Sequence, residues 1–135
     1  MGKIDLHTHS TASDGSLTPT QLVKSAHVQG VDRLALTDHD TTDGLQKAIE
    51  AGREYKVTVI PGIELSVNHE SGELHLLGYG FDKSNTEFSA IVKKLQLSRS
   101  DRNQEIITKL HELGYSISWD SILDIAGGGV IGRGH

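Results

Sequence analysis

The chain has 135 residues, a formal net charge of −5 and no cysteine. This length suits one domain with its own hydrophobic core, and the lack of cysteine excludes disulfides and thiolate metal sites, so any metal must be held by imidazole and carboxylate groups. We find no apolar run of the roughly 20 residues that cross a bilayer and no secretory leader, and we therefore expect a cytoplasmic protein without a membrane partner. The acidic balance, with no block of Lys or Arg, argues against a surface for duplex DNA.

The first half of the sequence alternates strand and helix patterns. A short buried strand is predicted at 3–8, followed by a helix that Thr18 can cap, with Pro19 at its first position, Gln21 completing a capping box and Gly30 just beyond its end. A strand at 32–40 with a polar end, a helix at 42–55 and a strand at 56–64 come next. This order with short links is typical of right-handed βαβ units on a parallel sheet.

The pattern changes after residue 64. Two strand-like runs, 64–67 and 72–80, predict a hairpin. Residues 86–113 have a helical pattern, which the polar stretch 98–104 is expected to divide into two helices; Gly114 ends the second and Ser118 can cap a short third one. A half-built parallel sheet leaves an open edge, which proteins normally cover, so we expect the chain to be the N-terminal portion of something larger.

Histidines and carboxylates recur at the ends of successive predicted strands. The carboxyl ends of parallel strands meet at one rim, where α/β proteins gather their ligands, and residues i and i+2 of a strand share a face. The candidate metal ligands on this reasoning are His7, His9, Asp14, His39, Glu64 and His75. Imidazole suits Zn, Fe and Mn, and carboxylates suit Mn and Mg. Two ions about 3.5–4 Å apart can share a hydroxide and clamp a phosphoryl group, so the set indicates a multi-metal hydrolytic site.

Structural roles remain open for several of these residues. Asp38 and Asp40 are interpreted as groups that orient His39 or cap the next helix, rather than as ligands. A lone strand histidine such as His75 is more often structural, and Glu64 alone would suit a cap or a surface carboxylate.

Other histidines carry weaker signals. His27 and His111 lie in amphipathic helices and are expected to be structural or solvent-facing, and no role is assigned to His69. The late Gly-Arg-Gly-His sequence suits phosphate binding by Arg133 and His135, because a guanidinium binds phosphate bidentately, but a frayed end explains it almost as well.

Five segments together resemble the PHP (polymerase and histidinol phosphatase) domain family: "DLHTHSTASDGSLTP", "ALTDHDTTDG", "PGIELS", "ELHLLGY" and "GGGVIGRGH". The resemblance covers essentially the whole chain, and its nearest branch looks like the bacterial PHP phosphoesterases that act on nucleotides, among them exoribonucleases of the RNase AM type and 3′,5′-nucleotide phosphatases. It implies an α/β fold, the N-terminal part of a distorted (β/α)7 barrel over 1–82, with the start of a helical insertion over 83–135.

The resemblance also implies a three-metal site. By position, His7, His9 and Glu64 would share one ion, Asp14 and His39 would hold a second, and Glu64 and His75 a third, which gives two or three divalent ions (Mn, Zn or Fe) as cofactors. The family's further His and late Asp-x-His lie downstream of residue 135. Its usual Gly-Arg-Pro-His motif stands here with Gly134 in place of proline.

Three hypotheses follow. The first is a metal-dependent phosphoesterase that hydrolyses phosphate esters of nucleotides or RNA 5′ ends through a metal-bound hydroxide. The second is a vestigial PHP module with a binding or scaffolding role. The third is a metal hydrolase of the amidohydrolase type, which also opens its barrel with His-x-His but usually uses a strand-borne lysine that the early strands here do not offer.

Overall fold

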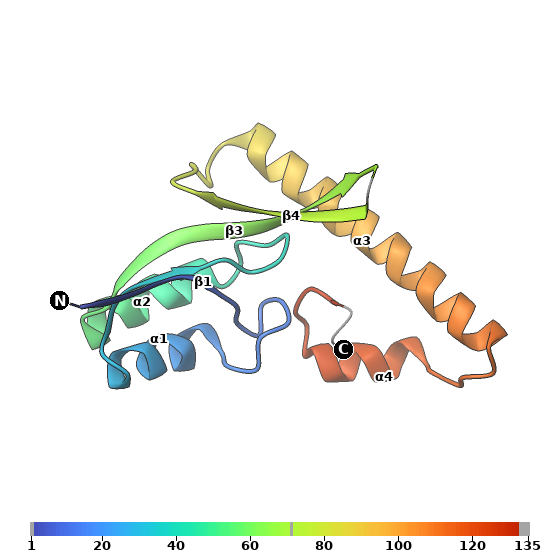
Figure 1. Ribbon diagram of the computed structural model, residues 1–135, viewed down its shortest axis with the longest axis horizontal. Helices are drawn as coiled ribbons and strands as arrows, with labels where there is room; N and C mark the ends of the chain where they lie inside the picture. Colours follow the sequence, from blue (N-terminus) through green and yellow to red (C-terminus); the bar gives the residue numbers. More distant parts are fainter. Residues whose placement is uncertain (1, 71, 133–135) are drawn as a thin grey trace.

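The computed structural model describes residues 2–70 and 72–132 (Figure 1). In chain order, the elements are β1 (Lys3–Thr8), α1 (Pro19–Val28), β2 (Val31–Leu36), α2 (Leu45–Tyr55), β3 (Thr58–His69), β4 (Gly72–Tyr79), α3 (Thr86–Glu112) and α4 (Trp119–Ala126). Within this part of the chain, no helix has both the length and the apolar character that a membrane crossing requires.

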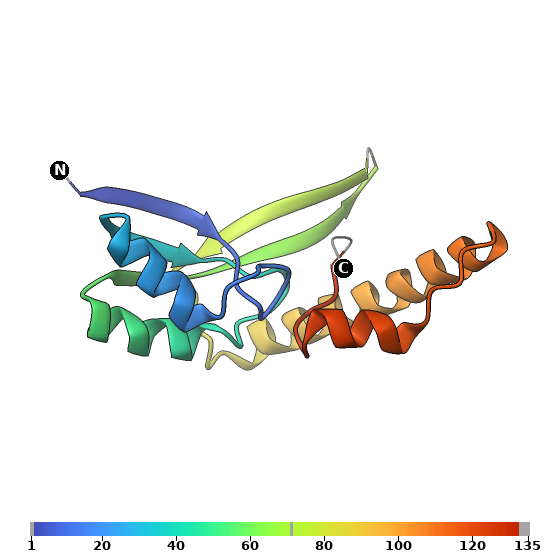
Figure 2. The same cartoon turned by 90° about the horizontal axis from the view of Figure 1, so that it is seen from below.

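The four strands form one curled sheet in the order β1-β2-β3-β4. β1, β2 and β3 run parallel, and β4 returns antiparallel to β3. Helices α1 and α2 pack against each other and cover one face of the sheet, while α3 and α4 extend away from it (Figure 2). This arrangement confirms the predicted α/β fold and the βαβ order of the first half.

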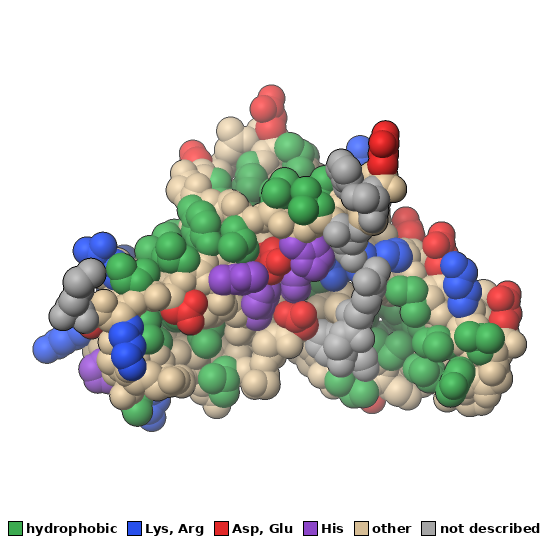
Figure 3. Space-filling view, viewed as in Figure 1, with side chains coloured by type: hydrophobic (Ala, Val, Ile, Leu, Met, Phe, Trp, Pro, Cys, Tyr) green, Lys and Arg blue, Asp and Glu red, His purple; other side chains and the backbone are tan. Residues whose placement is uncertain are grey.

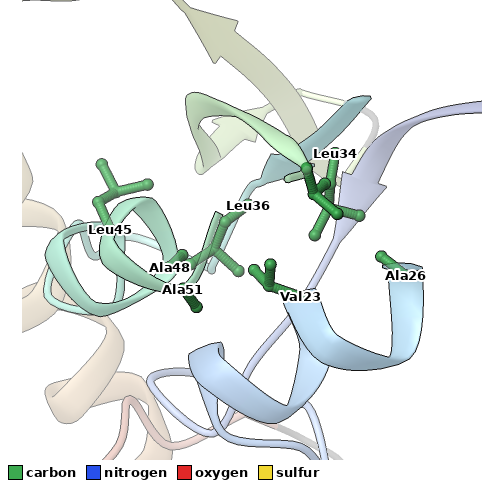
Figure 4. Close-up of a cluster of buried hydrophobic side chains, with 8 residues drawn as sticks. Val23, Ala26, Leu34, Leu36, Leu45, Ala48 and Ala51 are labelled. Carbon is green, nitrogen blue, oxygen red and sulfur yellow. The ribbon is translucent and has the colours of Figure 1, made fainter. Parts of the chain in front are cut away.

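The hydrophobic core lies between α1, α2 and the sheet (Figure 4). Leu34 and Leu36 of β2 are buried against apolar side chains of both helices, namely Val23, Ala26, Leu45, Ala48 and Ala51. The start of α1 is fixed by the predicted capping box between Thr18 and Gln21, and Gly30 adopts a positive φ of 73° just after it. The core therefore packs both helices against β2.

The predicted division between a third strand and a hairpin strand is wrong, because β3 is one 12-residue strand. Its first part, as far as Pro61, pairs with β2, and its remainder, from Gly62, pairs with β4. A Cβ atom at Gly62 would lie 3.0 Å from the carbonyl oxygen of Leu36 and 2.7 Å from a methyl of Thr37. Glycine thus lets β3 pass close to the end of β2 as it changes partner.

The predicted break at 98–104 is also wrong, since α3 is a single helix of 27 residues. Polar residues occur in its middle because the buried side of the helix faces polar partners there. Arg99 and Asn103, one turn apart, are both buried; Arg99 contacts Asp40, and Asn103 donates a hydrogen bond to the carbonyl of Ile131. The predicted end and restart are confirmed, with Gly114 at φ 89° and Ser118 capping α4.

Candidate metal centre

The candidate ligands lie at or just beyond the carboxyl ends of the parallel strands. His7 is in β1 and His9 follows it, His39 follows β2, and Glu64 of β3 forms an isolated parallel bridge with His39. β4 brings His75 to a position diagonally across the antiparallel ladder from Glu64, on the same face. Figure 3 shows histidine side chains gathered in the middle of one face of the molecule, with acidic side chains among them.

Glu64 is the centre of this cluster. Its side chain is only 6% exposed, and its Oε2 lies 2.9 Å from Nε2 of His7, 3.0 Å from Nε2 of His9 and 3.6 Å from Nδ1 of His39. Its other oxygen, Oε1, lies 3.0 Å from Nδ1 of His75. The carboxylate of this β3 residue therefore lies close to imidazoles from the other three strands of the sheet or from the residues that follow them.

Asp14 approaches the same cluster from the loop between β1 and α1. Its Oδ1 lies 3.5 Å from Nδ1 of His9, and its Oδ2 lies 3.5 Å from Nε2 of His39. His9 and His39 thus each stand between the two carboxylates. The six residues form three overlapping groups in which the possible ligand atoms lie within 4.8 Å of one another: His7–His9–Glu64, His9–Asp14–His39 and His39–Glu64–His75.

The electrostatics of the cluster favour ligand forms of both residue types. Burial lowers the pKa of His39 and outweighs the opposing attraction of Glu64 and Asp14, so its imidazole is neutral at physiological pH. Burial alone would raise the pKa of Glu64, but the hydrogen bond with His7 and the nearby His39, His7 and His9 together lower it. An ionised carboxylate and a neutral imidazole are the states that bind metal ions.

The residues present fit divalent ions. Two donor atoms bound to one tetrahedral ion at about 2.1 Å are about 3.4 Å apart, and the carboxylate–imidazole separations here run from 2.9 to 3.6 Å. In addition, Nδ1 of His39 is buried and has no hydrogen-bond partner among the described residues. A buried polar atom of this kind requires an explanation such as an ion or water, and the mixed imidazole and carboxylate donors suit Zn, Mn or Fe.

Comparison with known proteins identifies the family. The PHP domain family matches residues 5–131 of this chain. The chain belongs to the PHP family. This confirms the resemblance that the sequence motifs carry, and the match spans both the sheet with its histidine cluster and the α3–α4 segment.

Individual PHP relatives are hydrolases. The chain is 42% identical, over 98% of its length, to a 5′-3′ exoribonuclease of Haemophilus influenzae, and 34% identical, over 91% of its length, to a 3′,5′-nucleoside bisphosphate phosphatase of Chromobacterium violaceum. Among solved structures, a candidate metal-dependent phosphoesterase of Bifidobacterium adolescentis superposes with a TM-score of 0.90 at 31% identity over 98% of this chain. The chain spans about half the length of these relatives: 48%, 43% and 47%, respectively.

Asp38 of this PHP chain supports the loop that carries Asp14. Its buried carboxylate accepts hydrogen bonds from the backbone N–H and hydroxyl of Ser10 and from the hydroxyl of Ser13, all at 2.7 Å. Gly15 completes the turn, because a Cβ atom there would lie 2.4 Å from the carbonyl oxygen of His9. The structure thus places Asp38 outside the three ligand groups, beneath the loop.

Asp40 lies behind the cluster. Its buried carboxylate accepts from the backbone N–H of Ser66 and from the Arg99 guanidinium of α3. Sequence reasoning missed Arg99, which lies in the stretch interpreted as a break between helices. The available signal was the spacing of Arg99 and Asn103, four residues apart on the same face as Val92 and Ile107.

Two of the remaining histidines lie away from the cluster. His27 is exposed on α1, and exposed His111 contacts the carbonyl of Ile117 within the α3–α4 connection. Arg133 and His135 lie outside the described residues, as does the side chain of His69.

Proposed function

We propose that this PHP chain supplies metal-binding residues of a metal-dependent phosphoesterase that acts on phosphate esters of nucleotides or on RNA 5′ ends. The observation that carries the proposal is the position of Glu64, whose two oxygens face four imidazoles from three separate segments. Imidazoles on both oxygens of one buried carboxylate are the arrangement that a bridging carboxylate of a multi-metal site needs.

The proposal places one ion in each of the three groups. His7, His9 and Glu64 would hold one ion, Asp14 and His39 a second with His9 nearby, and Glu64 and His75 a third beside His39. Divalent ions bound there would lower the pKa of water toward about 7 and neutralise charge on a phosphoryl group. Glu64 would keep adjacent ions at a fixed spacing, and Asp38 would hold the Asp14 loop in place.

Names of the relatives support a nucleotide substrate. One is a 5′-3′ exoribonuclease and another a 3′,5′-nucleoside bisphosphate phosphatase, and both names describe phosphate esters of nucleotides. We further propose that residues 1–82 are the N-terminal part of the barrel and 83–135 the start of a helical insertion, since the sheet ends with β4 and the chain then continues into α3.

The experiment is a metal and turnover assay with matched histidine variants. The chain is purified, loaded with Mn²⁺, analysed for metal content and incubated with a nucleoside 3′,5′-bisphosphate and with a 5′-phosphorylated RNA oligomer. We expect bound metal and phosphate or nucleotide release. In His9→Ala the turnover should be lost and the metal content should fall, whereas both should be retained in His27→Ala, which removes an exposed histidine of α1.

Two results would contradict the proposal. Less than one ion per chain in a folded sample would remove the metal centre, and equal turnover in His9→Ala and the unmodified chain would place the chemistry elsewhere. Metal binding without turnover of either substrate would favour the binding-module hypothesis.

A further inference from the structure

Helix α3 follows the sheet in sequence, and it contacts Asp40 beside the candidate metal centre. Helix α3 packs against β3 over a short length, and at that contact its buried side carries charge. Arg99 is 7% exposed and Asp40 is fully buried. A buried charged side chain is costly unless it is paired, so each of these two side chains depends on the position of the other.

Arg99 and Asp40 form a dense set of hydrogen bonds. Nε of Arg99 donates to Oδ2 of Asp40 at 2.9 Å, and Nη2 lies 2.8 Å from the same oxygen. The same Nη2 donates to the hydroxyl of Ser66, and the backbone N–H of Ser66 donates to Oδ1 of Asp40 at 2.8 Å. Gln96, one turn before Arg99, donates to the carbonyl oxygen of Asp40 at 2.8 Å.

Asp40 connects directly to the backbone of two candidate ligands. It follows His39 in sequence, and its N–H donates to the carbonyl of Glu64 at 2.9 Å. Asp40 also adopts a positive φ of 51°, an uncommon conformation for a residue with a side chain, so its surroundings must hold it there. The contacts from α3 and from Ser66 supply that restraint.

We propose that Arg99 is a positioning residue of the metal centre, which acts through Asp40 to fix the separation of His39 and Glu64. The inference rests on the proposed metal-dependent function. It assigns to α3 a role in the site: the helix carries no candidate ligand, and its guanidinium instead fixes the backbone that carries two of them.

The test compares Mn²⁺ affinity, measured by calorimetry, in Arg99→Met and Arg99→Lys with two controls. Arg53→Met removes an exposed arginine of α2, and Val23→Ala destabilises the core away from the site. We expect Arg99→Met to weaken Mn²⁺ binding 10–100-fold, as loss of groups that orient ligands does. Arg99→Lys should lose less Mn²⁺ affinity than Arg99→Met, because lysine keeps the charge. It should still bind more weakly than the unmodified chain, because lysine cannot reach both Asp40 and Ser66 as a planar fork. Both controls should bind Mn²⁺ as the unmodified chain does.

A second readout uses the metal-free protein. Hydrogen exchange of the Asp40 amide, which donates to the carbonyl of Glu64, should be at least about tenfold faster in Arg99→Lys than in the unmodified chain. In Val23→Ala the exchange of this amide should change no more than that of other amides. If the unmodified chain binds no Mn²⁺, the proposed function fails. The exchange rate of the Asp40 amide then tests by itself whether Arg99 positions this backbone.

The inference is overturned if Arg99→Lys leaves both the Mn²⁺ affinity within twofold and the Asp40 exchange rate unchanged. It is also overturned if Val23→Ala weakens Mn²⁺ binding as much as the Arg99 variants do. Should Arg99→Met fail to fold, Arg99→Lys carries the comparison.

Discussion

Replacing Glu64 with Gln removes the charge at the centre of the cluster and keeps the shape of the side chain. Oxygens of Glu64 belong to two of the three ligand groups and lie 2.9 to 3.6 Å from four imidazoles. Loss of a group that only orients a ligand costs 10–100-fold in metal affinity, so loss of a direct, shared ligand should cost more than about 100-fold. At 1.36 kcal/mol per tenfold change, this corresponds to more than about 2.7 kcal/mol of binding free energy.

The assay is calorimetric titration with Mn²⁺ at about pH 8, where the imidazole of His39, whose pKa burial lowers, is neutral. Glu50→Gln, on the exposed surface of α2, makes the same change in charge without touching the cluster and should bind Mn²⁺ unchanged. Urea unfolding of both variants confirms that they are folded. An affinity of Glu64→Gln within tenfold of the unmodified chain would refute the reasoning, because Glu64 would then not be a shared ligand.

Three further outcomes are expected. The pKa values of His39 and Glu64 lie below their ordinary values of 6.5 and 4.5, so the unfolded chain binds protons more readily than the folded chain. The metal-free protein should therefore lose stability first below about pH 6.5 and further below about pH 4.5. A urea midpoint that does not change with pH in this range would contradict this. Asp38→Asn should cost about 2–3 kcal/mol in urea unfolding, because an amide N–H₂ replaces one of the two oxygens that together accept three hydrogen bonds, and it should also weaken Mn²⁺ binding. Gly15→Ala should lower the melting temperature or prevent folding, because its Cβ would lie 2.4 Å from a carbonyl oxygen; an unchanged melting temperature would show that the loop relaxes without cost.

Local signals in the sequence predicted most of the fold. The capping box at Thr18, the strand at 3–8 and the alternation of strands and helices depend on nearest neighbours, and all appear in the structure. The rule that parallel strands end at one rim then brings His7, His9, His39 and Glu64 together from the order of elements alone.

The two incorrect elements depend on long-range partners. Gly62 marks the point where β3 exchanges β2 for β4, and the sequence alone does not show that the strand continues across this change. Arg99 resembles a solvent-exposed residue of a linker until Asp40, 59 residues earlier, is placed beside it. The helical spacing of Arg99 with Val92 and Ile107 places it on the inner face, but only the fold shows which partner it meets there.

The support of the Asp14 loop was equally hidden. Ser10 and Ser13 lie in a stretch that is simply polar in the sequence, and only the fold reveals that both donate to Asp38. The residues that support the candidate ligands are therefore harder to predict than the candidate ligands, because their types are common and their spacing follows no motif.

The most direct test of the metal centre is anomalous diffraction from crystals of this chain grown with Mn²⁺. We predict a Mn²⁺ peak in contact with Glu64, His7 and His9, and further peaks beside Asp14 and His75 at lower occupancy. A well-ordered map in which Glu64 still bonds only to imidazoles, with Mn²⁺ confined to other surface carboxylates, would contradict the account.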